Sequence, residues 1–416
     1  MLRAMASNDL KWIRAGRFVD VVAGEVRHAQ LITIRGNRVE SVEPETGAYP
    51  EGVRDLSAYT VLPGLIDCHA HLIGEVESGH GYAALVQRSA AQEALSGVGN
   101  ARDTILAGFT TVRDVGTFRA LVDVALREAI DRGDVLGPRM MCAGAYVTCA
   151  SGAGDVTGLA PDIDAVVPRD LRFGVSNNVD EVRDAVRRIL HGGADFIKML
   201  ATGAVLTEGM TPGAPEFSEA ELRAGVEEAA LYGTHVAAHA HGAEGIKRAV
   251  RAGVRSIEHG SLMDDESIAM MAEAGTYLVA DVWNGDWIAQ QGRAQGWSAD
   301  VLRKNDETTD AQRQGFAKSV EAGVKIAYGT DSGVYPHGMS AKQLAYMVKF
   351  GMTPMQAVQS ATVVAAELMG WQDRVGAIEP GRFADLIAVE GDPLEDLDRF
   401  TDVAFVMKGG EVVKGG

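Results

Sequence analysis

The chain has few cysteines, a deficit of basic residues and no long apolar run. Only Cys68, Cys142 and Cys149 are present, too few and too odd in number for a disulfide framework, so we expect a reducing compartment. The 39 basic residues are outnumbered by 57 acidic ones, and the formal charge of −18 opposes binding to nucleic acid or anionic lipid surfaces. No apolar run approaches the length of a membrane span, and residues 1–30 lack the pattern of a secretory leader. These absences favour a cytoplasmic protein that binds neither nucleic acid nor membrane.

The overall composition is that of an ordinary globular protein. Hydrophobic residues make up 46% of the chain and charged residues 23%, which are typical globular values. A chain of 416 residues exceeds one ordinary core, but a (β/α)8 barrel with an accessory domain reaches this length. No separate second enzyme is needed to explain the length.

Between Pro63 and about Gly370, short β-branched runs alternate with amphipathic helical stretches, which is typical of parallel βα units. Val179–Leu190 has apolar residues at helical spacing, and Ser218–Tyr232 opens with a capping box. Eight βα units favour a closed barrel with its chemistry at the carboxyl ends of the strands. The predicted strands are Leu65–Asp67, Thr110–Asp114, Met140–Tyr146, Asp195–Met199, His235–His239, Ser256–His259, Tyr277–Asp281 and Lys325–Thr330.

The two ends of the chain differ from the middle. Residues from about 10 to 47 and from 376 to 416 contain short alternating strands with turns such as Gly36-Asn37 and Gly409-Gly410. We expect these two flanks to pair in one sheet beside the barrel. The predicted division is residues 1–62 and 376–416 for this accessory unit, and residues 63–375 for the barrel.

The most informative segment is Asp67-Cys68-His69-Ala70-His71, which directly follows an apolar run. Alternate side chains of a strand point to the same face, so His69 and His71 can hold one cation together. A His-x-His pair alone is weak evidence for a metal site. Four later strand ends strengthen it, because each carries a polar residue suited to a metal site: Lys198, His239, His259 and Asp331.

Imidazole and carboxylate ligands suit Zn²⁺ and its divalent neighbours, and Zn, Co, Mn and Fe all remain open. Lys198 is unusual because an ammonium group cannot ligate a cation. In a dry site, however, its pKa falls and the neutral amine can react with CO₂ to give a carbamate that bridges two metals. We therefore predict two ions with carboxylated Lys198 between them, one held by His69, His71 and Asp331 and the other by His239 and His259.

Ions about 3.5–4 Å apart would activate a water molecule and polarise a scissile carbonyl. Asp331 would then carry the proton from that water to the leaving nitrogen. His241 is assigned either to contact with the substrate or its oxyanion, or to structural support. His337, and His80 and Tyr82 on the loop after the first strand, are further candidates for function.

Two loops have the length or chemistry to shape a substrate pocket, namely Val147–Arg172 and Trp283–Trp297. Trp283 and Trp287 are predicted to form a pocket wall, although packing under the loop would explain them equally well.

The motifs identify the chain as resembling the amidohydrolase superfamily, and within it the imidazolonepropionase-like, metal-dependent prolidase subgroup. The resemblance spans nearly the whole chain. It implies a distorted (β/α)8 TIM barrel beside a small β-sandwich built from both termini, a binuclear site with a carboxylated lysine, and hydrolysis of C–N bonds. It rests on the segments Leu62–His71, Gly108–Asp114, Gly193–Lys198, His239-Ala240-His241-Gly242, Ile257-Glu258-His259-Gly260, Gly329-Thr330-Asp331 and Pro380–Ile387.

The substrates implied by the resemblance are dipeptides and N-acyl amino acids with a free carboxylate, and some similar enzymes cleave ochratoxin A to phenylalanine and ochratoxin α. Similar enzymes often carry a Thr-Gly-Gly-His-Gly-like stretch after the third strand, where this chain has Ala153 in place of the histidine. A small apolar residue there leaves room for a bulkier aromatic acyl group. We therefore favour an amidase for N-acyl aromatic amino acids, with ochratoxin A the sharpest candidate and Arg113 and His241 as carboxylate contacts.

Three alternatives remain. A Xaa-Pro dipeptidase or another dipeptidase or carboxypeptidase would use the same ligands. A mononuclear deaminase or imidazolone hydrolase would need a glutamate soon after His239, and Glu244 comes too late. A non-enzymatic scaffold would have lost ligands, and none is missing. A homo-oligomer is expected on base rates.

Overall fold

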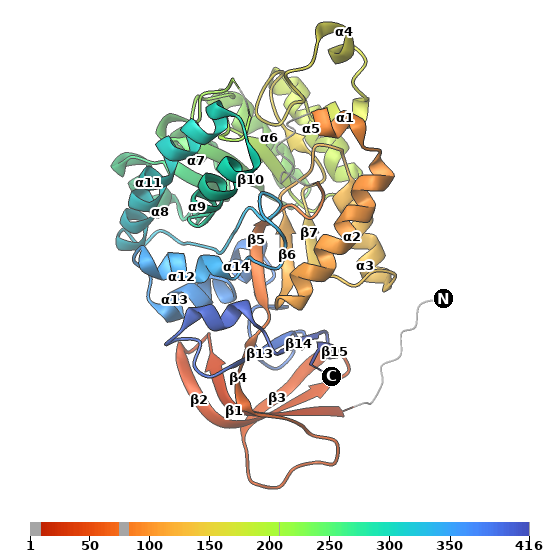
Figure 1. Cartoon of the computed structure of the whole chain (residues 1–416), viewed down its shortest axis with the longest axis vertical. Coiled ribbons are helices and arrows are strands. Elements are labelled where there is room, and N and C mark those ends of the chain that lie inside the picture. The colour runs from red at the N-terminus through yellow and green to blue at the C-terminus, as the bar shows by residue number, and fades with distance from the viewer. Residues whose placement is uncertain (1–9, 75–82, 208, 416) are drawn as a thin grey trace.

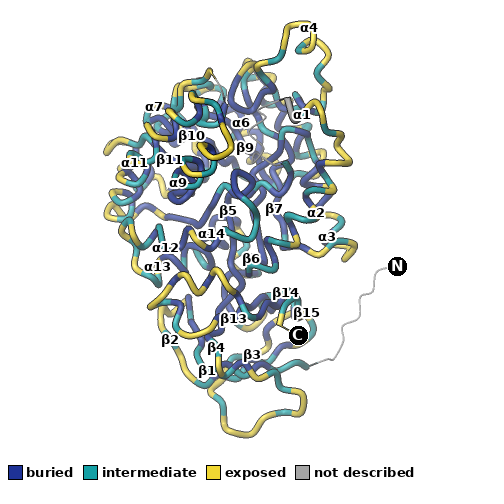
Figure 2. The backbone as a smooth tube through the Cα atoms, in the orientation of Figure 1, coloured by how far each residue is buried: buried dark blue, intermediate teal, exposed yellow. Residues whose placement is uncertain are grey.

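The computed structural model describes residues 10–74, 83–207 and 209–415. A barrel of strands and helices forms the larger part of the molecule, and a sheet made of strands from both ends of the chain lies below it in Figure 1. The strands of the barrel are buried and its outer helices carry most of the exposed residues (Figure 2). This arrangement agrees with the predicted α/β barrel and accessory sheet.

Parallel pairing joins the barrel strands in two groups. One sheet has the order β12-β11-β10-β9-β8 and the other has the order β5-β6-β7. Every residue of β5, β6, β9 and β12 is buried, as expected for strands covered on both faces. The bounds are β5 (Leu65–Ala70), β6 (Phe109–Asp114), β7 (Arg139–Cys142), β8 (Tyr146–Val147), β9 (Ile197–Leu200), β10 (Val236–Gly242), β11 (Ser256–Leu262) and β12 (Tyr277–Val279).

The third predicted strand, Met140–Tyr146, is divided into β7 and β8. The break lies at Gly144, whose φ of 76° belongs to the left-handed region that side chains disfavour. β7 pairs with β6, and β8 pairs with β9. The prediction of one continuous strand here was therefore wrong.

The eighth predicted strand, Lys325–Thr330, forms no regular ladder. Its contacts include an isolated parallel bridge from Leu278 to Ile326. Toward β5, the Cys68 amide donates to the Tyr328 carbonyl at 2.8 Å and the Thr330 amide donates to the His69 carbonyl at 3.2 Å. The Tyr328 amide instead donates to the Ser360 carbonyl at 3.0 Å. The segment thus bonds to Leu278 of β12 on one side and to Cys68 and His69 of β5 on the other, and the barrel closes here without a regular ladder.

The predicted helices are present. Val179–His191 forms α5, and Ser218 caps α6 (Glu219–Leu231) in a capping box with Glu221. The other helices of the barrel and its loops are α1 (Ala83–Gln87), α2 (Ala90–Leu106), α3 (Val122–Arg132), α4 (Pro161–Asp164), α7 (Ala243–Ala252), α8 (Asp265–Ala274), α9 (Asn284–Trp287), α10 (Arg293–Gln295), α11 (Ala299–Glu321), α12 (Lys342–Lys349), α13 (Pro354–Ser360) and α14 (Val363–Met369).

The two flanks pair as expected, in a seven-stranded sheet of order β15-β14-β13-β4-β1-β2-β3. Edge strand β3 also bonds the segment before β13, since the Val39 amide donates to the Arg382 carbonyl at 2.9 Å. The sheet therefore curls around its own core, which includes Ile13, Ile32 and Leu386. Its strands are β1 (Leu10–Asp20), β2 (Glu25–Arg35), β3 (Arg38–Pro44), β4 (Arg54–Pro63), β13 (Leu386–Glu390), β14 (Phe405–Lys408) and β15 (Glu411–Lys414).

Within the three described ranges, no helix has both the length and the apolar character needed to cross a membrane.

Candidate metal centre

The end of β5 brings His69 and His71 to one carboxylate. The Nε2 atoms of His69 and His71 lie 3.4 and 3.3 Å from Oδ1 of Asp331. Each ring is oriented through its other nitrogen, with His69 Nδ1 2.8 Å from Glu258 Oε2 and His71 Nδ1 2.8 Å from the Gly116 carbonyl. Such partners hold a ligating imidazole in the tautomer that presents Nε2 to a metal. The three side chains form one potential ligand group.

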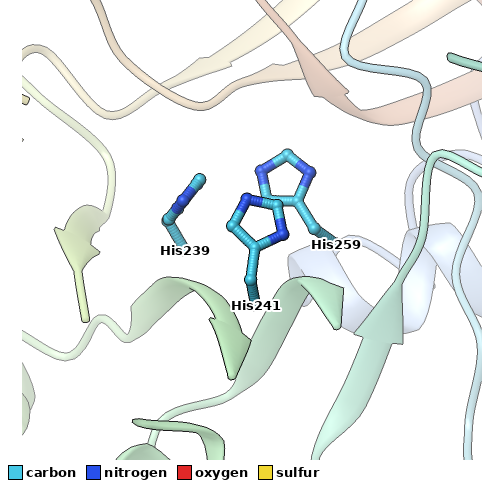
Figure 3. A group of neighbouring side chains, drawn as sticks. All are labelled: His239, His241 and His259. Atoms are coloured by element: carbon cyan, nitrogen blue, oxygen red, sulfur yellow. The ribbon is translucent and has the colours of Figure 1, made fainter. Parts of the chain in front are cut away.

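A second group comes from β10 and β11. His239 and His241 belong to β10, His259 belongs to β11, and their three rings gather in one space in Figure 3. The centroid of the His239 ring lies 4.6 Å from those of both His241 and His259. His241 Nδ1 contacts the Ser261 hydroxyl at 2.8 Å. The structure therefore places His241, which was predicted to contact the substrate or its oxyanion or to give structural support, among the potential ligands.

His259 and Asp331 connect the two groups, since both belong to a third potential ligand group with Asp281. The His259 ring centroid lies 4.7 Å from that of His69. His259 and Asp331 also have left-handed backbones, with φ of 67° and 58°. A non-glycine residue is strained in this region, and such strain persists where the surroundings hold a functional side chain in place.

Lys198 on β9 lies at the floor of the same cavity. It is only 2% exposed, and its Nζ has no hydrogen-bond partner among the described residues. Burial lowers the pKa of Lys198 to about 8, although the charge of Glu258 opposes the change. A substantial fraction of the amine is therefore neutral near pH 8, and the neutral amine is the form that reacts with CO₂.

These side chains fit metal ions better than they fit one another. His239 Nε2, like Lys198 Nζ, is buried without a hydrogen-bond partner in the described chain, and native proteins rarely leave such atoms unsatisfied. Burial, followed by the charges of His259 and His241, holds the pKa of His239 well below its usual value, so the ring is neutral and can donate a lone pair. The potential ligands that the structure brings together are His69, His71, His239, His241, His259, Asp281 and Asp331, and Lys198 lines the same cavity.

Asp331 is ionised in this environment. Burial raises the pKa of its carboxyl group, but hydrogen bonds with His69 and His71 outweigh that effect and hold the pKa well below its usual value. An ionised carboxylate can ligate a cation and accept a proton. Asn284 contacts the other oxygen, with Nδ2 3.2 Å from Asp331 Oδ2.

The ligand cluster lines a cavity of about 490 Å³, a size that small-molecule sites commonly have. Its polar floor includes the six predicted ligands and His241. The walls are largely apolar and come from loops and from helix α11. They include Phe118, Leu159, Leu206, Ile288, Trp297 and Val301.

The structure places Arg113 outside the cavity lining, in contrast to its predicted contact with a substrate carboxylate. Its side chain is fully buried under the ligand cluster and does not line the cavity. The guanidinium donates to the Cys68 carbonyl at 2.6 Å, to Ser256 Oγ at 3.0 Å and to Glu258 Oε1 at 2.7 Å. Arg113 therefore supports Glu258, which in turn orients His69.

The predicted pocket wall is also wrong. Trp283 and Trp287 do not line the cavity but pack with Tyr335, with the centroids of the Trp283 and Tyr335 rings 4.5 Å apart. Trp297, from the far end of the same loop, lines the cavity instead.

His337 also lies outside the cavity lining, with Nδ1 3.3 Å from Thr104 Oγ1. The remaining candidates, His80 and Tyr82, fall outside the described residues.

The sequence interpretation missed Asp281, Glu258 and Asn284. Asp281 ends a predicted strand, and its Oδ1 lies 3.1 Å from His259 Nδ1, so its position was a usable signal. Glu258 lies beside His259 in the quoted motif, yet its role depends on the neighbouring strands. Glu244, the residue considered for a deaminase, is exposed and ion-paired with Arg248, so it supplies no acid to this cavity.

Comparison with known proteins agrees with this geometry. The profile of the amidohydrolase family matches residues 60–413. This chain belongs to the amidohydrolase family. The predicted family is therefore confirmed, and this amidohydrolase is a metal-dependent hydrolase with histidine and aspartate clusters at the strand ends.

Individual relatives cover most of the amidohydrolase chain. Ochratoxinase from Aspergillus niger is 34% identical over 374 residues, which are 85% of this chain and 76% of the relative. The crystal structure of A. niger ochratoxinase has a TM-score of 0.88 and 30% identity, covering 98% of this chain and 96% of the other. A Xaa-Pro dipeptidase with bound methionine has a TM-score of 0.91 and 39% identity, covering 98% and 100%. These structures confirm the distorted barrel.

The contacts of Glu258 give a first testable prediction for this amidohydrolase. Glu258→Gln should weaken metal binding on the order of 10- to 100-fold, because the loss of a charged partner leaves His69 less basic and less firmly oriented. Metal retained after dialysis against graded chelator measures the change. Glu228→Gln is the control, since Glu228 has little exposed surface but pairs with Arg183 and Arg187. Equal metal retention in both variants would contradict this role of Glu258.

Proposed function

We propose that this amidohydrolase cleaves the amide bond of N-acyl amino acids or dipeptides with a free carboxylate, with ochratoxin A, split into phenylalanine and ochratoxin α, as the sharpest candidate. One observation carries the proposal: the potential metal ligands line a cavity whose other walls are largely apolar. The cluster suits hydrolysis of a polarised carbonyl, and the apolar walls suit an aromatic acyl group. The substrate is therefore a small amide rather than a polymer.

We further propose a binuclear centre of two divalent ions, with Zn²⁺ as the metal and a CO₂-derived carbamate on Lys198 between them. The two potential ligand groups lie next to each other, because His259 of one and Asp331 of the other also belong to a third group. This proximity supports two adjacent ions. The partnerless Nζ of Lys198 and its lowered pKa support the carbamate. Bound in this way, the ions would polarise the carbonyl and lower the pKa of a water molecule.

The protein side chains do the remaining work. Asp331 accepts the proton from the attacking water and gives it to the leaving nitrogen, so that the amine departs neutral. His241, whose Nδ1 contacts the Ser261 hydroxyl, lines the cavity beside the cluster. We assign it to the carbonyl oxygen or to the substrate carboxylate, where a fixed hydrogen bond stabilises negative charge.

The comparisons favour two related activities. The A. niger ochratoxinase supports the amidase, and the Xaa-Pro dipeptidase supports a second candidate, cleavage of dipeptides before proline. Ala153 favours the first, because it lines the cavity with a small apolar side chain. A cytoplasmic location and a homo-oligomer complete the proposal, on the basis of cysteine usage and base rates.

A substrate panel tests the proposal. Steady-state kcat/KM is measured on N-acyl amino acids with small and aromatic acyl groups, on dipeptides including Xaa-Pro, and on ochratoxin A. The proposal expects the highest values for aromatic acyl groups on amino acids with a free carboxylate. Cleavage restricted to Xaa-Pro bonds would establish the second candidate instead.

Ala153 gives a prediction about acyl size. Ala153→Phe should lower kcat/KM for ochratoxin A by about 10-fold or more while leaving acetyl amino acids nearly unchanged, because the ring fills volume that only the large acyl group needs. Ala150→Phe is the matched control, since Ala150 lies in the same loop but is exposed. A parallel loss for acetyl and aromatic substrates would show that Ala153 does not face the acyl group.

A further inference from the structure

Asn284 stands beside both carboxylates of the cluster with one polar atom unused. It begins α9, is 4% exposed and lines the cavity. Its Nδ2 donates to Asp281 Oδ2 at 3.1 Å and to Asp331 Oδ2 at 3.2 Å. An ionised carboxylate can accept hydrogen bonds but cannot donate them. The amide of Asn284 must therefore turn its nitrogen toward the two carboxylates and its oxygen away from them.

That oxygen, Oδ1, is buried and has no hydrogen-bond partner in the described part of the chain. A buried acceptor without a donor is disfavoured, and because Asn284 lines the cavity, a ligand bound there can supply the missing donor. The Nδ2 atom of the same amide donates to Asp331, so a ligand group that supplies this donor lies near that carboxylate. In an amide hydrolysis that group is the leaving nitrogen, to which Asp331 returns a proton.

We propose that Asn284 Oδ1 accepts a hydrogen bond from the N–H of the scissile amide and so selects secondary amides. The inference rests on the proposed amide hydrolysis and deepens it by naming the substrate class. Asn284 acts as a specificity-determining and positioning residue, with its nitrogen fixing Asp331 and its oxygen fixing the leaving nitrogen.

The chemistry explains why this bond matters during cleavage. Water adds through oxygen to the carbonyl carbon, the C–N bond breaks, and its electron pair remains on nitrogen. The proton that water gave to Asp331 then passes to that pair. A hydrogen bond from the N–H to Asn284 orients the nitrogen so that its lone pair faces Asp331, which shortens the path of the proton.

The consequence is discrimination against amides that lack an N–H. Xaa-Pro bonds and N-methyl amides are tertiary and leave Oδ1 unsatisfied. Because a buried polar group without a partner is costly, we expect tertiary amides to react on the order of 10- to 100-fold more slowly than secondary amides. Ochratoxin A and ordinary N-acyl amino acids keep the N–H and are accepted.

The test compares matched substrates in the metal-loaded enzyme. Pairs such as N-acyl-phenylalanine and N-acyl-N-methylphenylalanine are assayed with wild type and Asn284→Ala. The corresponding ester serves as a control for the bulk of the methyl group, because it lacks both the N–H and the methyl. Wild type should favour the N–H amide about 10- to 100-fold. In Asn284→Ala the rate for the N–H amide should fall by this 10- to 100-fold advantage. The rates for the N-methyl amide and the ester should fall only by a smaller amount common to all substrates, because Asp331 is less ordered in the variant.

Two further variants separate recognition from structure. Asn284→Ser provides a second replacement if the alanine variant folds poorly. Asp286→Asn changes a side chain on the same helix that binds Tyr346 and Arg313 outside the cavity lining, and it should leave the ratio between paired substrates unchanged. Equal wild-type rates on paired substrates would overturn the inference, as would an Asn284→Ala variant that gains N-methyl turnover without losing N–H turnover, since that pattern means steric exclusion.

A binding measurement gives a readout other than turnover. Calorimetry with an N–H phosphonamidate and its N-methyl counterpart should show about 10-fold or more tighter binding of the N–H compound to wild type, and equal binding to Asn284→Ala at unchanged metal content. Equal binding to wild type would overturn the inference. Absence of hydrolysis for every amide, with the difference in binding retained, would instead count against the proposed function and support this assignment of Asn284.

Discussion

Lys198→Ala is expected to abolish amide hydrolysis, with a loss of about 1,000-fold or more in kcat/KM. The variant cannot form the carbamate that the proposal places between two ions, so at least one ion should bind poorly. The barrel should still fold, because Lys198 Nζ makes no hydrogen bond within the described chain. Turnover, metal content and melting temperature are measured on the same preparation.

Chemical complementation makes this prediction sharper. A small carboxylic acid such as acetate should restore part of the activity of Lys198→Ala, because it can occupy the space of the missing carbamate. Lys304→Met is the matched control: Lys304 is also fully buried, but its Nζ pairs with Asp300 and the Thr207 carbonyl away from the ligand groups. Near-full turnover in Lys198→Ala without added acid would contradict the assigned role.

Asp331→Asn should lower kcat by about 100- to 10,000-fold, the range associated with the loss of a general acid–base group. Asparagine has the shape of aspartate and tolerates the left-handed backbone at this position, where φ is 58°. The fold should therefore survive, and circular dichroism with thermal melting tests it. Asparagine cannot accept and return the proton from water.

Asp286→Asn is the control for this substitution. Asp286 lies close by on α9, but its carboxylate binds Tyr346 and Arg313 rather than the ligand cluster. Its variant should retain most of the wild-type kcat. An Asp331→Asn enzyme with comparable turnover would show that proton transfer does not depend on Asp331.

Much of the site was predictable because strand geometry is regular. Alternation along β5 places His69 and His71 on one face, and the parallel order of the barrel brings strand ends together at one edge. The positions of His239, His259 and Asp331 follow from the same rule. Pairing of the two flanks into one sheet was expected from their composition, and the structure shows it.

The errors arose where tertiary contacts decide the outcome. The pattern around Arg113 gives its position on β6 but does not show that Glu258 and Ser256 occupy its guanidinium. Tryptophan content predicted an aromatic wall, yet the path of the loop turns Trp297 rather than Trp283 into the cavity. A short apolar run likewise cannot reveal that Gly144 interrupts it.

The central claim is a centre of two ions bridged by modified Lys198, and the number of metal ions bound per chain tests it most directly. Wild-type protein is loaded with Zn²⁺ in the presence of bicarbonate, freed of excess metal, and analysed by mass spectrometry of the metal against protein concentration. We predict two ions per chain in wild type and fewer in Lys198→Ala. One ion per fully active wild-type chain would contradict the account.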